Sequence, residues 1–279
     1  MNRNDLIESL KMKPIKRTKI RIILGKAFYR TRRYMQWYLG RKKYSRELVS
    51  DIYPNIYFQH KTPVLRKLKD VDMWMQYNKV KNLKIAVRKI NNIVIKPGET
   101  FSYWRLIGKP TEKKGYVDGM VLFYGGFKAG VGGGLCQLSN LIYWMTLHTP
   151  LKVVERYRHS YDVFPDSNRN QPFGSGATCV YNYRDLQIYN GTEDTFQLRV
   201  YLEDDYLIGE WRTESPQNFK YEVYEKEHSI KQEFWGGYTR HNVIYRKVFA
   251  YNDTFLRDEY VTENYAIMMY NPLLSEKSG

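Results

Sequence analysis

The chain has 279 residues, enough to bury a substantial core, and its 43% hydrophobic and 16% aromatic content excludes an intrinsically disordered protein. Its two cysteines, Cys136 and Cys179, are too few for a disulfide framework, so nothing in the chain requires an oxidising compartment. The net charge is +16, of which residues 1–49 carry +12 (15 Lys or Arg against 3 Asp or Glu), leaving +4 for residues 50–279.

Residues 1–49 form a basic leader in which apolar and cationic side chains alternate. The longest purely apolar run, residues 22–24, is too short to span a bilayer, which takes ~20 residues, or to serve as a secretion signal. A cationic helix with an apolar face suits an anionic membrane surface, and the alternative is a solvated basic helix docked on its own domain. Nucleic acid is not an expected partner, because no DNA-binding or RNA-binding signature accompanies the charge. We expect a cytoplasmic protein, with peripheral attachment to the inner membrane face as an alternative.

The predicted elements follow in chain order. Residues 65–91 carry apolar side chains at a helical period, and the pattern predicts a helix that ends at Asn91-Asn92. Strands are predicted at 93–95 and 120–124, and a helix over 135–148 is ended by Thr149-Pro150. Residues 151–161 and 177–183 are predicted strands on either side of a polar loop.

Beyond residue 195, alternating apolar residues predict a series of hairpins. The fold class is therefore α+β: mixed helices with an antiparallel sheet, a helix-borne cysteine packed on strands, and a β-rich C-terminal part. We expect three regions, which are a basic leader over 1–49, a core over 50–195 and a β-rich C-terminal region over 196–279.

The stretch GVGGGLCQLSN at residues 130–140 is the strongest candidate for a functional site. A glycine loop that leads into a helix places Cys136 in the first turn, where free backbone amides and the helix dipole favour an anion. A thiolate is such an anion, so the pKa of Cys136 can fall here and the thiol can become a nucleophile. The alternative is a flexible turn followed by a core cysteine.

A possible catalytic triad consists of Cys136 on the helix, His159 on a following strand and Asp185 beyond a second strand. By analogy this is the layout of papain-like and transglutaminase-like enzymes. His159 would take the thiol proton and Asp185 would hold its tautomer, while backbone amides from Gly134 to Gln137, or the Gln137 side chain, would stabilise an oxyanion. The alternatives are a hydrogen-bonded strand histidine and an aspartate in a turn or an ion pair.

The substrate of such a site would be an amide or ester, such as a peptidoglycan peptide or precursor. The glycines can hold an anion at the helix start, and Arg156 can bind a carboxylate or pair locally with Glu155. We expect no cofactor and no metal, because the sequence has no close Cys or His pair and no phosphate loop. The candidate substrate-binding residues are Gly132, Gly133, Gly134, Gln137, Ser139 and Arg156.

These motifs together resemble the VanW family, named from vancomycin-resistance clusters of the VanB type. The matching pieces are KPGETFSYW (96–104), YVDG (116–119), GGGLCQLSN (132–140), Pro150-Leu151, Glu155-Arg156 with His159, Ala177-Thr178, and Asp185-Leu186 with Asn190. The family often has an acidic residue before the Ala-Thr pair, and this chain has Gly176 there.

The resemblance implies a role in glycopeptide resistance or bacterial cell-envelope biology. One hypothesis is a cysteine-dependent acyl transferase or amide hydrolase acting on cell-wall peptides or precursors. The other is a non-catalytic module at the membrane surface that binds an anionic envelope precursor or a partner enzyme.

Overall fold

The computed structural model describes residues 18–66, 71–123, 126–163 and 171–274. The chain forms two compact units, Met1–Gly40 and Arg41–Gly279. In the first unit, helix α2 (Lys19–Tyr38) is capped by Thr18, whose hydroxyl oxygen accepts the Arg21 amide at 3.3 Å. Residues 1–17 of the predicted leader lie outside the described residues. No helix in the described part of the chain is long and apolar enough to cross a membrane.

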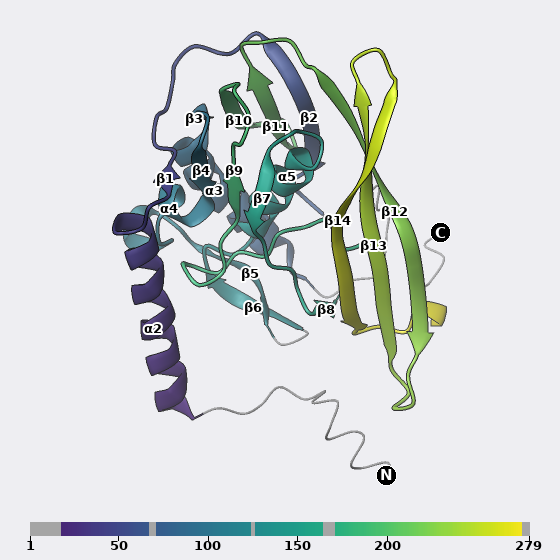
Figure 1. The fold of residues 1–279 in the computed structure, drawn as a ribbon. Coiled ribbons are helices and arrows are strands. Elements are labelled where there is room, and N and C mark those ends of the chain that lie inside the picture. Colours follow the sequence, from purple (N-terminus) through teal and green to yellow (C-terminus); the bar gives the residue numbers. More distant parts are fainter. Residues whose placement is uncertain (1–17, 67–70, 124–125, 164–170, 275–279) are drawn as a thin grey trace. The chain divides into compact units, whose positions relative to one another are not determined.

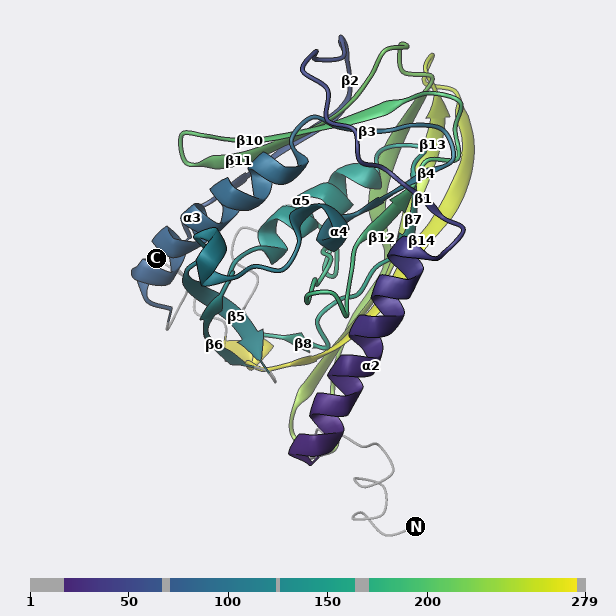
Figure 2. The same cartoon turned by 90° about the vertical axis from the view of Figure 1, so that its left-hand side faces the viewer.

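The second unit is built around an antiparallel sheet in the order β2-β11-β10-β3 (Figure 1). Helix α5 packs on β11 and β2, and helix α3 packs on β10, so both helices cover this sheet (Figure 2). The sheet joins strands from distant parts of the chain, and the boundary predicted at residue 195 falls inside this unit. The bounds are β2 (Asn55–Pro63), α3 (Met73–Ile90), β3 (Ile93–Ile95), α5 (Cys136–Thr146), β10 (Phe196–Glu203) and β11 (Tyr206–Thr213).

A second sheet has the order β1-β4-β9-β7, with β1 parallel to β4 and the other pairs antiparallel. Strand β4 runs directly into the short helix α4, and a separate hairpin of β5 and β6 precedes the glycine loop. The bounds are β1 (Lys43–Tyr44), β4 (Glu99–Ser102), α4 (Tyr103–Ile107), η1 (Glu112–Lys114), β5 (Asp118–Phe123), β6 (Gly126–Val131), β7 (Lys152–Glu155) and β9 (Gln187–Tyr189).

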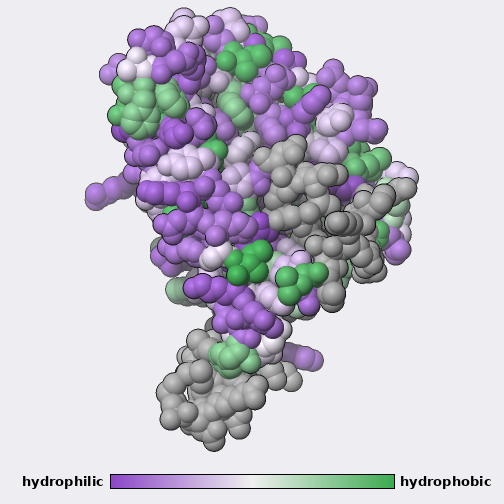
Figure 3. Space-filling view, turned by 90° about the vertical axis from the view of Figure 1, so that its right-hand side faces the viewer, coloured by the Kyte–Doolittle hydropathy of each residue, from purple (hydrophilic) through white to green (hydrophobic). Residues whose placement is uncertain are grey.

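The C-terminal strands form a long antiparallel meander, β12-β13-β14, to which β8 adds in parallel. Ile244, Val248 and Ala266 are buried on its inner side. The outer surface on this side of the molecule is mainly hydrophilic, with hydrophobic residues in separate spots (Figure 3). The bounds are β8 (Tyr161–Asp162), β12 (Phe219–Gln232), β13 (Tyr238–Ala250), β14 (Phe255–Met268) and η2 (Pro272–Leu274).

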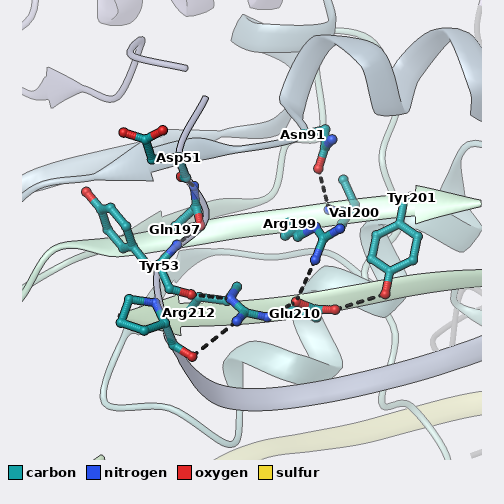
Figure 4. Close-up of polar contacts among 10 residues, drawn as sticks. Asp51, Tyr53, Asn91, Gln197, Arg199, Val200, Tyr201, Glu210 and Arg212 are labelled. Carbon is teal, nitrogen blue, oxygen red and sulfur yellow. Dashed lines mark hydrogen bonds and ion pairs between the residues drawn. The ribbon is translucent and has the colours of Figure 1, made fainter. Parts of the chain in front are cut away.

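A buried polar network fixes the segment that leads into β2 to the strands β10 and β11 (Figure 4). Arg212 donates from Nε to the Tyr53 carbonyl oxygen at 2.5 Å and pairs with Glu210 at 2.5 Å. Gln197 donates from Nε2 to the Asp51 carbonyl oxygen at 2.8 Å. The residues before β2 are therefore an integral part of the second unit.

The predicted α+β class and the late antiparallel hairpins are confirmed. The strand predicted at 177–183 is wrong, because these residues form an extended segment followed by a turn in which Val180 and Arg184 pair. The predicted strand over 151–161 ends early at Glu155, so His159 lies in the connection between β7 and β8.

Candidate functional site

The glycine loop before α5 is shaped by close packing. Gly132 and Gly134 have φ of 78° and 91°, a region that favours glycine. A Cβ atom on Gly133 would overlap the backbone of Gly119 in β5, and one on Gly134 would overlap the Lys79 side chain of α3. The three glycines therefore let the loop pass directly against a strand and a helix.

The backbone amides of the three loop glycines are already engaged, so these glycines do not form the predicted anion cradle. Gly132 donates to the Val117 carbonyl oxygen at 3.0 Å, and Gly133 donates to that of Gly130 at 2.9 Å. Gly134 donates to the Met120 carbonyl oxygen at 3.0 Å. These three amides hold the loop to the β5–β6 hairpin and to the residue that precedes it, and they are not available to a substrate anion or oxyanion.

The amide of Gln137 is also used, since it donates to the Gly134 carbonyl oxygen at 3.0 Å. Its side-chain amide donates to the Thr62 hydroxyl oxygen and to the Pro63 carbonyl oxygen, both at 2.9 Å. Gln137 thus ties the start of α5 to the end of β2, which differs from the predicted oxyanion role.

Ser139 and Asn140 hold the segment after the polar loop against α5. Ser139, fully buried, donates its hydroxyl to the Ala177 carbonyl oxygen at 2.7 Å. The Asn140 side-chain oxygen accepts the Ala177 amide at 2.7 Å. A Cβ atom on Gly176 would lie 2.7 Å from that same oxygen, so glycine suits this position. Ser139, predicted to bind substrate, is therefore a packing residue.

Cys136 is the first residue of α5, as predicted, and it remains partly exposed, whereas Cys179 is buried. The Cys136 thiol makes a long contact of 3.8 Å with the Cys179 carbonyl oxygen. Burial of the sulfur raises the pKa of the Cys136 thiol above its usual value, which corrects the expected fall. The thiol is therefore protonated at neutral pH in the free protein.

His159 carries no positive charge at neutral pH. Burial and the nearby charges of Arg184 and Arg158 lower the pKa of His159 to about 4. Within the described residues, no hydrogen bond joins its ring to Cys136 or Asp185. The expected hydrogen-bonded relay from cysteine to histidine to aspartate is absent from this part of the structure.

Asp185 is fully buried at the junction of β4 and α4. Its carboxylate accepts the Ser102 hydroxyl at 2.5 Å, the Trp104 amide at 2.9 Å and the Leu186 amide at 3.0 Å. These bonds satisfy the buried charge and satisfy a free amide at the start of α4. Asp185 is thus a structural residue. Its bonds to Ser102 and Trp104 join two motifs that lie far apart in the sequence, so the sequence alone did not reveal this role.

Arg156 is committed to the protein rather than to a substrate carboxylate. Its guanidinium donates to the Gly176 carbonyl oxygen at 2.9 Å, to the Gly174 carbonyl oxygen, and to Asn264 of β14 at 3.2 Å. The same group lies 4.8 Å from the centre of the Tyr143 ring on α5. Arg156, the residue after β7, therefore joins this end of the strand to residues 174–176, to α5 and to β14.

Two further arginines near this segment were not singled out from the sequence. Arg158 and Arg184 act on His159, and the only signal for them was the local density of charged and tyrosine residues at 156–161 and 181–185. No group of three or more metal-ligating side chains occurs in the described residues.

The chain is similar to one protein family and to two curated proteins. Residues 78–212 match the family model described as VanW like protein. The chain is 42% identical over 139 residues to the vancomycin B-type resistance protein VanW of Enterococcus faecalis, which covers 50% of each chain. It is 35% identical over 119 residues to the uncharacterized protein YoaR of Bacillus subtilis, covering 43% of this chain and 38% of that protein.

The chain thus spans about half the length of the first of these relatives and less of the second. No solved structure matches it. The matched segment contains the glycine loop, Cys136, His159 and Asp185. Residues 78–212 of this chain are therefore similar to the VanW family, and the Enterococcus relative bears the name of a vancomycin B-type resistance protein.

Proposed function

We propose that this protein is a cysteine-dependent acyl transferase or amide hydrolase that acts on cell-wall peptides or precursors, with Cys136 as the nucleophile. One observation carries the proposal. Gln137, Ser139 and Asn140 each hold the start of α5 through a hydrogen bond of 2.9 Å or less, whereas the Cys136 thiol contacts its neighbour only at 3.8 Å. A rigid frame around an uncommitted thiol is what a nucleophile requires.

The reaction needs a base, because the pKa of the Cys136 thiol is raised. His159 is the candidate, since its pKa of about 4 leaves the imidazole neutral and able to accept a proton. Substrate binding must bring the ring and the thiol together, as catalytic hydrogen bonds often tighten only in the complex.

In the proposed step, the Cys136 sulfur attacks the carbonyl carbon of an amide and passes its proton to His159. The carbon–nitrogen bond breaks, the amine leaves with that proton, and a thioester remains on Cys136. Water completes a hydrolysis, and an acceptor amine completes a transfer. The vancomycin-resistance name of the Enterococcus relative supports a cell-wall substrate.

The test is to incubate the purified protein with a soluble peptidoglycan stem peptide, quench with acid, and measure the intact mass. We expect an acyl adduct that maps to Cys136 and is lost in Cys136→Ala. Cys179→Ala is the matched control and keeps the adduct. Release of the amine product at an equal rate by wild type and Cys136→Ala would refute the proposal.

A second candidate function, attachment to an anionic membrane surface, is favoured by α2. Ile20, Leu24 and Phe28 recur at i, i+4 spacing, are exposed, and so form an apolar stripe along the helix. The helix has no acidic residue and carries several lysines and arginines. Such a helix lies in the headgroup region, with its apolar stripe toward the acyl chains.

Flotation with liposomes tests this second function. We expect the full chain to float with vesicles that contain phosphatidylglycerol and not with pure phosphatidylcholine vesicles. A protein that begins at Arg41 should remain at the bottom of the gradient. Equal flotation by both forms would remove α2 as the anchor.

A further inference from the structure

A cationic cluster lies in the connection after β7 and the turn before β9. The Arg184 guanidinium lies over the rings of Tyr157 and Tyr183, at 5.7 Å and 5.6 Å from their centres. Arg158 donates from its guanidinium to the His159 carbonyl oxygen at 3.1 Å. We call Arg158, His159 and Arg184 the Arg158–Arg184 site.

The Arg158–Arg184 site and Cys136 border the same short stretch of backbone. The Thr178 amide donates to the Tyr157 carbonyl oxygen at 2.7 Å, and the Cys136 thiol contacts the Cys179 carbonyl oxygen. Val180 and Arg184 exchange backbone hydrogen bonds of 2.9 Å and 2.8 Å. Residues 178–180 therefore contact the Cys136 thiol at one position and the backbone of the cationic site at the two neighbouring positions.

No carboxylate among the described residues pairs with the guanidinium of Arg158 or Arg184. The acidic residues that are near in sequence are engaged elsewhere. Asp185 is buried on α4, Asp162 pairs with a buried arginine of β13 at 3.5 Å, and Glu155 accepts the Asp185 amide at 3.2 Å. Within the ranges that the structure describes, the partly buried side chains of Arg158 and Arg184 therefore have no carboxylate partner.

This arrangement costs free energy in the absence of a ligand. Burial and the charge of Arg156 lower the pKa of Arg158 to about 10, which reports desolvation and repulsion between like charges. Partly desolvated guanidinium groups bind an incoming anion more strongly than fully solvated ones do. Tyr157 and Tyr183, which are 40% and 43% exposed, add flat apolar walls beside the charge.

We propose that the Arg158–Arg184 site binds the free C-terminal carboxylate of a peptide and so selects the substrate class of the Cys136 site. Planar guanidinium groups match carboxylates in a bidentate geometry, and the tyrosine rings suit the adjoining peptide. A bound carboxylate also neutralises the field on His159, which favours proton transfer to that ring. The link to substrate selection rests on the proposed acyl-transfer function, whereas binding of the carboxylate does not.

The test uses full-length protein with Cys136→Ala, so that binding is measured without any reaction. The probes are acetyl-trialanine with a free C-terminal carboxylate, the same peptide as its C-terminal amide, and inorganic phosphate, each titrated by calorimetry. We expect the acid to bind at least about tenfold more tightly than the amide, and Arg184→Gln and Arg158→Gln each to remove about tenfold of that affinity.

Arg257→Gln, at an exposed arginine of β14, is the matched control and keeps full affinity. If Arg184→Gln does not fold, Arg184→Lys keeps the charge but loses the planar fork, and it should still weaken binding of the acid. Equal binding of acid and amide, equal affinity of the Arg184 variants and wild type, or tighter binding of phosphate would each overturn the proposal. Carboxylate binding without any acyl adduct on Cys136 would refute the acyl-transfer function alone.

Discussion

The hydroxyl of Ser102 donates to the carboxylate of Asp185 at 2.5 Å, across 83 residues of sequence. The same carboxylate accepts the Trp104 amide at 2.9 Å. It therefore fixes the junction of β4 and α4 to the segment before β9. Asp185 is thereby committed to the fold and does not orient His159.

Replacing Asp185 by Asn separates the structural role from a catalytic one. The loss of a buried charge-assisted bond to Ser102 should lower the free energy of unfolding by about 1–3 kcal/mol, measured by urea denaturation. The rate of thioester formation per folded molecule should stay within about twofold, whereas a triad aspartate would cost ~10⁴. A large loss of rate with unchanged stability would contradict the structural role.

Gly133→Ala should destabilise the protein by more than about 3 kcal/mol, because its Cβ would overlap the backbone of Gly119. Gly98→Ala is the matched control: Gly98 has φ of 77° but open space around it, so the cost should be about 1 kcal/mol. Thermal and urea unfolding of both variants measure the difference. Similar values for the two would argue against close packing of the loop.

Alkylation by iodoacetamide should report the raised pKa of the Cys136 thiol. We expect slow modification at pH 7 and a rate that still rises above pH 9, because only the thiolate reacts. Cys179 is buried and should react only on unfolding. A rate for Cys136 that is already at its plateau at pH 7 would show that the thiol is ionised in the free protein.

Acid should destabilise the protein through His148. Burial lowers the pKa of this residue to about 4, and its ring stacks on Phe58 at 3.9 Å. Between the usual pKa of a histidine and about 4, the unfolded chain binds the proton and the folded protein does not. The stabilisation is therefore complete above pH 6.5 and is lost as the pH falls toward 4.

For His148, which is only 8% exposed, this loss amounts to about 3 kcal/mol. Urea unfolding between pH 7.5 and pH 4 measures it. His148→Gln should be less stable at pH 7.5 through lost stacking, but its stability should fall less on acidification. An identical slope in the variant would assign the acid sensitivity to other groups, among them His159.

Local patterns in the sequence were sufficient for the secondary structure around the motif. A glycine run followed by apolar residues at a helical period predicts α5 with Cys136 at its start, and short alternating runs predict the late hairpins. The strand predicted at 177–183 failed because that segment is held by α5 and Tyr157 and then turns at Val180. Such tertiary bonds leave no periodic signal.

The roles of the site residues were harder to predict from the sequence, because they too depend on tertiary contacts. Glycines before a helix fit both an anion site and a close backbone approach, and only the position of Gly119 and the hydrogen bonds of the glycine amides distinguish the two. Likewise, an aspartate downstream of a histidine fits a triad until its bond to Ser102 is known. Residue types and order define what chemistry is possible, whereas the choice depends on contacts across many tens of residues.

The pairing of β2 with β11 determines where a shortened version of this protein can begin. The segment that matches the VanW family starts at residue 78, after β2, which covers the edge of β11 and anchors Gln137 next to Cys136. A recombinant fragment of 78–212 would expose the open edge of β11, a template for aggregation, and would release the first turn of α5. Expression of the domain should therefore start at Arg41, the first residue of its compact unit.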